Sequence, residues 1–239
     1  MEIFNFGNTV VNNYVYKTEG GYVLIDTGYE KNYNHFKRCL KRNNLDFNDF
    51  FLVFITHAHD DHVGYLNRLL SDFPKFKLVL SEKALPNLHL GQNSNKGGPT
   101  SGLALLVTYF LGLTLPKDHK FPAIEKRFDS RLITINEENI IDLGKELGGK
   151  IIETPGHTED SISLLLLDGS LFCGDAAMNG FPSHHNISVW AENKDDYKSS
   201  WNKIIKTKAK KLFPGHGKPF KLDNIKANLN YVDKIKIHR

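Results

Sequence analysis

The 239-residue sequence predicts an α+β fold in which two mixed β-sheets pack face to face with helices on the outside. One reason is that strand-like and helix-like segments occur in both halves, without the regular alternation of a parallel α/β protein. The other is an ordinary globular composition, 40% hydrophobic and 24% charged, on a chain long enough for a large core. We therefore expect a single domain over residues 1–239, with an inserted element at about 86–130.

The N-terminal half is expected to open with a β-hairpin. Strand-like segments at 10–17 and 21–26 flank Glu19-Gly20-Gly21, which is typical of a tight turn. The run FFLVFI at 50–55 is continuously apolar and has the length of a buried strand. We also expect helices at 32–42 and 65–73 and a strand at 77–80.

The C-terminal half is expected to contain a second hairpin, because Asp168-Gly169 joins strand-like segments at 161–167 and 170–173. The other expected elements are strands at 131–135, 150–154 and 211–213 and helices at 195–206 and 223–236. Four residues recur at helical spacing in the last helix and predict a core-facing stripe: Ile225, Leu229, Val232 and Ile235.

The inserted element at 86–130 is rich in glycine and proline and contains an apolar helix near 101–111 with almost no polar face. Such a helix must be buried against the body of the protein or against another subunit. We expect a lid or a homodimer contact that builds an apolar substrate pocket, with Tyr109 and Phe110 lining it. Ordinary core packing is the alternative.

Composition narrows the function classes. The net charge of +4 is modest, and the lysines of the C-terminal quarter are expected to lie on a solvated surface, so nucleic-acid binding is disfavoured. The N-terminus lacks the pattern of a signal peptide, and the longest apolar stretch is shorter than the roughly 20 residues that span a bilayer. We expect a cytoplasmic protein with no membrane partner and a small-molecule substrate.

The chemistry is concentrated in THAHDDHVG at 56–64, directly after the strand predicted at 50–55. His57 and His59 are two residues apart, and Asp61 and His62 follow closely. Crowded imidazoles and carboxylates repel one another and lose hydration unless a metal ion binds them. We therefore expect these four residues to be metal ligands, and Asp60 to face solvent.

Three further polar residues follow predicted strands and have a glycine beside them: His157 in TPGHTEDS, Asp175 in LFCGDAA and His216 in LFPGHGKP. Glycine beside a ligand allows a tight turn and close backbone approach. Seven candidate ligands are more than one metal ion needs, and they suit two ions that share a carboxylate and a bridging hydroxide.

Together these motifs resemble the signature of the metallo-β-lactamase-fold hydrolases. The resemblance covers nearly the whole chain, because VLIDTG at 23–28 also matches the early Asp-Thr-Gly turn of that family. It implies a four-layer αββα sandwich with two Zn²⁺ ions at one edge, although such ligands also accept iron or manganese.

Residue roles follow from the same resemblance. It implies that His57, His59 and His157 hold the first metal, that Asp61, His62 and His216 hold the second, and that Asp175 bridges them. Asp61 would also take part in catalysis directly. Asp26 would orient the ligands by hydrogen bonds from outside the ligand set.

The identity of the expected ligands also narrows the branch of the superfamily that the chain resembles. His59 stands where flavodiiron oxidoreductases of this superfamily carry Glu, so redox chemistry is disfavoured. Asp175 is a residue that true β-lactamases generally replace with Cys or lack, so antibiotic hydrolysis is disfavoured. Met178 occupies the position where acyl-homoserine lactonases typically place Tyr. We expect a hydrolase in which a metal-bridging hydroxide cleaves a small ester, thioester or lactone; the alternative is a phosphodiesterase or nuclease. A second candidate wall of the substrate pocket comprises Met178, Phe181, His184 and His185.

Overall fold

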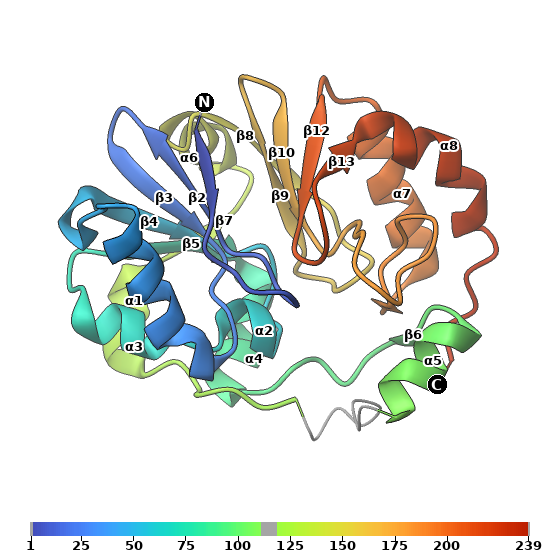
Figure 1. Cartoon of the computed structure of the whole chain (residues 1–239), viewed down its shortest axis with the longest axis horizontal. Helices are drawn as coiled ribbons and strands as arrows, with labels where there is room; N and C mark the ends of the chain where they lie inside the picture. The colour runs from blue at the N-terminus through green and yellow to red at the C-terminus, as the bar shows by residue number, and fades with distance from the viewer. Residues whose placement is uncertain (1, 111–118, 239) are drawn as a thin grey trace.

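The computed structural model describes residues 2–110 and 119–238. Two β-sheets lie face to face, with helices covering the outer side of each (Figure 1). This confirms the predicted α+β class and the four-layer αββα arrangement. The part of the insertion at 111–118 lies outside the described residues.

The first sheet has the strand order β1-β2-β3-β4-β5-β7. Its first three strands are antiparallel, and β3, β4, β5 and β7 run parallel, so the sheet is mixed. The strands are β1 (Ile3–Asn5), β2 (Tyr14–Thr18), β3 (Gly21–Ile25), β4 (Phe50–Phe54), β5 (Lys77–Ser81) and β7 (Leu132–Ile135).

The second sheet has the order β13-β12-β10-β9-β8 and is also mixed, because β10 and β12 are parallel while the other pairs are antiparallel. Its strands are β8 (Gly149–Glu153), β9 (Ile162–Leu166), β10 (Ser170–Gly174), β12 (Lys211–Pro214) and β13 (Phe220–Lys221). A separate short pair joins β6 (Gly98–Pro99) to β11 (Trp190–Ala191).

Helices cover the sheets because each buries one apolar face. Phe36 and Leu69 pack outside the first sheet, and Trp201 and Ile225 pack outside the second. The helices are α1 (Tyr33–Arg42), α2 (Asp60–Val63), α3 (Leu66–Asp72), α4 (Leu85–Leu90), α5 (Gly102–Phe110), α6 (Ile140–Glu146), α7 (Lys194–Ile205) and α8 (Leu222–Val232). None of the helices in the described ranges is long and apolar enough to span a membrane.

Two predictions need correction. Helix α6 was not predicted: Gly144 interrupts its helical pattern, and the helix forms by packing against β8. Helix α8 ends at Val232 instead of residue 236, and Ile235 is buried beyond the helix end. The chain leaves the helix there because the tail runs to β6, where the His238 N–H donates to the Pro99 carbonyl (3.0 Å).

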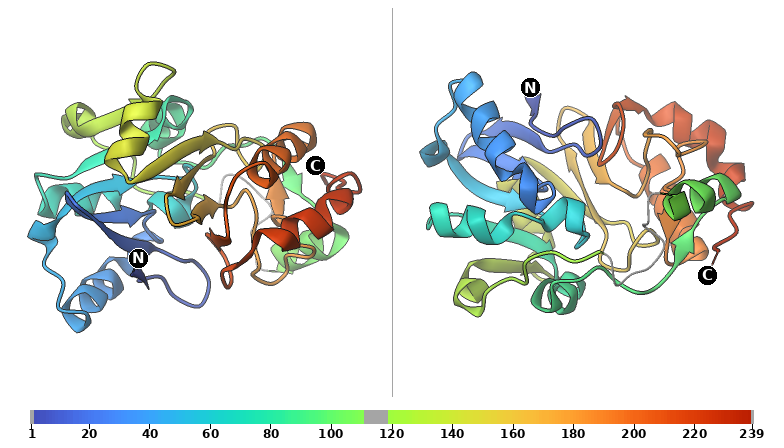
Figure 2. Two further views of the ribbon diagram at one scale, coloured as in Figure 1. Left: turned by 90° about the horizontal axis from the view of Figure 1, so that it is seen from above. Right: turned by 60° about the horizontal axis from the view of Figure 1, so that its bottom comes forward.

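Helix α5 leaves most of its large apolar side chains exposed. Only Ala104 and Thr108 are buried, whereas Tyr109 is 68% and Phe110 is 77% exposed. The helix lies beside the C-terminal tail and away from α1 and α3 (Figure 2). Within residues 2–110 and 119–238, little of the surface of this helix is covered by the rest of the chain.

An aromatic cluster joins the two sheets across the centre of the molecule. Phe172 of β10 stacks on Tyr16 of β2 at 5.3 Å between ring centroids, and it also contacts Tyr14 and Phe213. All four side chains are buried. The spacing between the sheets, and so the distance between the loops at their edges, depends on this cluster.

We expect Phe172→Ala to lower the free energy of unfolding by about 3–5 kcal/mol, because it leaves a cavity between the sheets. Urea denaturation of the metal-free protein, followed by circular dichroism, measures the change. Leu167→Ala is the control, since Leu167 is 92% exposed. Equal losses in the two variants would contradict the role assigned to the cluster.

Candidate metal centre

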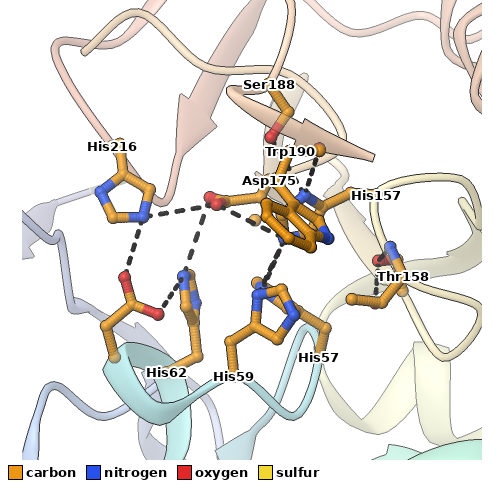
Figure 3. A network of polar contacts seen from close by, with 12 residues as sticks. His57, His59, His62, His157, Thr158, Asp175, Ser188, Trp190 and His216 are labelled. Carbon is orange, nitrogen blue, oxygen red and sulfur yellow. Dashed lines mark hydrogen bonds and ion pairs between the residues drawn. The ribbon is translucent and has the colours of Figure 1, made fainter. Parts of the chain in front are cut away.

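The structure brings all seven ligand candidates together at one edge of the sandwich. His57, His59 and His62 lie on one side of the cluster, and His157, Asp175 and His216 lie on the other (Figure 3). His57, His59 and His62 follow the end of β4, whereas His157, Asp175 and His216 follow β8, β10 and β12. Each sheet therefore contributes one half of the site.

Three imidazoles form the first group. The His157 Nε2 atom lies 3.2 Å from His57 Nε2 and 3.1 Å from His59 Nδ1. His57 and His157 are buried, so neither nitrogen is well hydrated. One ligand atom from each of the three residues lies within 4.8 Å of the others.

The second group contains Asp61, His62 and His216. The His216 Nε2 atom is 3.1 Å from Asp61 Oδ2, and His62 Nε2 is 3.8 Å from Asp61 Oδ1. Asp175 lies between the two groups: its Oδ2 is 3.3 Å from His216 Nε2 and 3.7 Å from His157 Nε2. Its carboxylate can therefore serve both groups.

Hydrogen bonds at the other ring nitrogen orient four of the imidazoles. On the first-sheet side, His62 Nδ1 contacts Asp26 Oδ2 (2.8 Å) and His57 Nδ1 contacts the Thr56 hydroxyl (3.0 Å). Since the Thr56 hydroxyl itself donates to Asp26 (2.7 Å), both rings donate from Nδ1 and direct Nε2 toward the centre.

The imidazoles contributed by the second sheet are oriented in the same way, by a hydrogen bond at Nδ1. His157 Nδ1 contacts the Trp190 carbonyl (2.9 Å) and the Ser188 hydroxyl (3.0 Å). His216 Nδ1 contacts the Val10 carbonyl (2.7 Å). A carbonyl can only accept, so both rings carry their proton on Nδ1 and present Nε2 to the cluster.

Two special backbone positions allow this crowding. Asp26 has a left-handed backbone (φ 56°), which is unusual for a residue other than glycine and places its carboxylate against both β4 and α2. Gly215 has no room for a side chain, because a Cβ atom there would lie 2.4 Å from Asp175 Oδ1. The loop that carries His216 can therefore lie directly on the cluster.

Electrostatics divides the imidazoles into two kinds. Burial, reinforced by the neighbouring imidazoles, lowers the pKa of His57 and His59 well below the usual range, so both are neutral ligands. Burial also acts to lower the pKa of His62, but the carboxylates of Asp61 and Asp26 outweigh it and raise that pKa to about 9. His62 therefore holds a proton at neutral pH that a metal ion must displace.

Two buried atoms test whether this cluster fits a cation. In the part of the chain that the structure describes, His62 Nε2 and Asp175 Oδ1 are both buried without a hydrogen-bond partner, and they lie 3.7 Å apart. Leaving such atoms unpaired is costly, and a divalent ion would satisfy both. Together with the convergent Nε2 atoms, they show that the residues present fit a pair of metal ions.

Some residues of the site escaped the sequence analysis. Ser188 and Trp190 contact His157, and the buried Asp160 accepts from the Ala58 N–H (2.8 Å) within the histidine motif. Asp160 lies near His157 in the sequence and could have been noticed, whereas no local pattern marks Ser188. The expectation for Asp60 was wrong: its side chain is only 16% exposed and is bound by Asn93.

The candidate pocket residues do not form one wall. Met178 is buried, with its N–H donating to the Asn186 carbonyl, whereas Phe181 is 82% exposed. The His185 ring stacks on Tyr231 of α8 at 3.5 Å, and His184 packs against His185. The role of these residues, and of Tyr109 and Phe110 on α5, stays a prediction.

Known proteins share both the sequence pattern and the fold. The chain is 26% identical to a beta-lactamase-like protein 2 homolog of Caenorhabditis elegans over 86% of this chain, but the match spans only 55% of that protein. It is 27% identical to a probable metallo-hydrolase of Methanocaldococcus jannaschii, with 82% of each chain covered. The structure of TTHA1623 in a di-iron-bound form has a similar fold, with a TM-score of 0.63, 21% identity and coverage of 94% of this chain and 96% of that one. The family model of the metallo-beta-lactamase superfamily matches residues 6–216, so the chain belongs to this superfamily.

Proposed function

We propose that the protein is a metal-dependent hydrolase that cleaves a small ester, thioester or lactone at a dinuclear site. The observation that carries this proposal is the position of Asp175. Its buried carboxylate lies between two groups of imidazoles, and its Oδ1 atom has no hydrogen-bond partner among the described residues. A site of this composition is suited to two ions that share one carboxylate.

The ions would supply a water of lowered pKa as nucleophile and Lewis-acid stabilisation of the oxygen that becomes charged. Five imidazoles and only two carboxylates, Asp61 and Asp175, would hold them. Since neutral imidazoles add no charge, the loaded site would keep a net positive charge. Such a site favours the anionic transition state of acyl hydrolysis.

Zinc is our first choice of metal because imidazole and carboxylate ligands suit it in hydrolytic sites. The same donors also accept iron or manganese. A cytoplasmic location is consistent with Cys39 and Cys173, which are both unpaired and buried.

An acyl substrate is supported by the position of the insertion. The Thr100 hydroxyl, just before α5, donates to the Ser188 carbonyl (2.6 Å), and the Ser188 hydroxyl contacts His157 (3.0 Å). The apolar helix α5 is thus fastened close to the first group of ligands. We propose that its exposed side chains contact the acyl part of the substrate.

A phosphodiester substrate has less support. The C-terminal lysines would have to face the ligands, but Lys210 lies at the opposite end of β10: its N–H donates to the Gly169 carbonyl (2.7 Å), whereas Asp175 follows the other end of the strand. The turn that carries Lys210 and Lys211 is therefore remote from the cluster, and of the C-terminal lysines Lys218 alone stands within two residues of a candidate ligand, His216.

We expect His59→Ala and Asp175→Ala to lose bound metal and to lower hydrolytic activity by roughly 100-fold or more, since replacing even a residue outside the ligand set costs 10–100-fold. Plasma emission spectroscopy measures metal per chain. Asp142→Ala is the control, because Asp142 is an exposed acid on α6. An Asp175→Ala variant that is fully active but depleted of metal would refute the proposed mechanism.

The substrate class is tested by comparing the hydrolysis of an acyl substrate and a phosphodiester by the zinc-loaded protein. We expect an acyl thioester or a lactone to be hydrolysed with a much higher kcat/KM than bis-p-nitrophenyl phosphate. A higher kcat/KM for the phosphodiester would contradict the proposed function and favour a phosphodiesterase or nuclease.

The proposed contact between α5 and the acyl part of the substrate is tested by substitutions on the exposed face of the helix. We expect the double variant Leu106→Ser, Phe110→Ser to lower kcat/KM for a hexanoyl ester about tenfold and to leave kcat/KM for an acetyl ester unchanged. The reason is that each buried methylene contributes about 0.8 kcal/mol, and the acetyl group has no methylene to bury. Ile141→Ser is the control, because Ile141 is 66% exposed but lies on α6. Unchanged kinetics together with loss of a dimer in sedimentation would assign this face to a second copy of the chain.

A further inference from the structure

The insertion is fastened to the metal-ligand motif at Asp60. The Asp60 N–H donates to Asn93 Oδ1 (2.8 Å), and Asn93 Nδ2 donates back to Asp60 Oδ1 (2.9 Å). His119, on the returning limb of the insertion, places Nδ1 3.5 Å from the same carboxylate oxygen. Asn93 is buried, so this pair is shielded from water.

These bonds act on a very short helix. Helix α2 spans only Asp60–Val63, and two of its residues, Asp61 and His62, are candidate ligands. A helix of one turn has few internal hydrogen bonds and does not hold its own conformation. Its direction must be fixed by contacts from outside.

The N-terminus of α2 also lacks its usual local cap. The N-cap residue is His59, whose side chain makes no capping bond and belongs instead to the first group of imidazoles. The first N–H of the helix, that of Asp60, has no acceptor within the helix and needs one from elsewhere. Asn93 provides it from a segment 33 residues away.

We infer that Asn93 is a positioning residue for the second metal: by capping α2 from the insertion, it fixes the direction in which Asp61 and His62 present their ligand atoms. Asn93 does not touch the metal itself. The inference rests on the metal binding in the proposed function and is independent of the substrate.

The insertion has a second attachment that makes a suitable control. Asn67 of α3 donates from Nδ2 to the Ala123 carbonyl (2.6 Å) and accepts from the Glu125 N–H (3.1 Å). Asn67 thus holds the returning limb with the same chemistry as Asn93, but it is not bonded to α2. A residue that only anchors the insertion should behave like Asn67.

The experiment is a zinc titration of the full chain against a competing chelator, with the two binding steps resolved. We expect Asn93→Ala to weaken the second step by roughly 10–100-fold and the first step much less. Asn67→Ala should leave both steps unchanged. Equal zinc binding by Asn93→Ala and the unmodified protein would overturn the inference.

A charge exchange makes the test independent of folding defects. Asn93→Asp places a second carboxylate against that of Asp60, so it should weaken the second zinc-binding step more than Asn93→Ala does. In the double variant D60N/N93D the new amide can donate to the new carboxylate, which can still accept the backbone N–H, so we expect zinc binding to recover. Failure of the double variant to recover, when its thermal melting matches the unmodified protein, would also contradict the inference.

The outcome separates this inference from the proposed function. If the unmodified protein binds two zinc ions but hydrolyses no acyl substrate, the function fails and the role of Asn93 can still be measured. If acyl hydrolysis is found but Asn93→Ala binds zinc normally, only the role of Asn93 fails.

Discussion

The carboxylate of Asp26 is the interaction on which the metal edge depends. It is buried, and it accepts hydrogen bonds from the Thr56 N–H (2.7 Å), the Thr56 hydroxyl (2.7 Å) and His62 Nδ1 (2.8 Å). A buried carboxylate is costly unless such bonds compensate it, and here they also join the ends of β3 and β4 to α2. The strained backbone of Asp26 is therefore maintained because three segments hold it in place.

The two halves of the site come from different sheets, so their separation is set by contacts between the sheets. The Tyr14 hydroxyl donates to the Pro214 carbonyl (3.1 Å), and Asn12 reaches the same carbonyl from Nδ2 (2.9 Å). These bonds tie the N-terminal hairpin to the loop that carries His216. These hydrogen bonds and the aromatic cluster together fix the distances between the two halves of the candidate metal centre, and none of them uses a ligand side chain.

Local patterns were sufficient for the hairpin at Asp168-Gly169, the buried strand β4 and the candidate ligands that the structure brings together, because each depends on residues close in sequence. The rest could not be read in this way. Asn93 and Ser188 act through partners more than 30 residues away, at Asp60 and His157, and no periodicity connects such pairs. Exposure of the α5 side chains likewise depends on where the insertion is attached, which no pattern within the helix specifies.

The insertion is attached at both sides of the centre. The chain between α4 and β6 crosses from the first-sheet half to the second-sheet half (Figure 1), with Asn93 bonded to Asp60 before the crossing and Thr100 bonded to Ser188 after it. Scattered exposed apolar residues such as Leu167 need no explanation, but α5 exposes several on one short helix that carries no charge. The segment that leads into α5 is bonded to both halves of the site, so under the proposed function the helix would present its apolar surface to the acyl part of the substrate.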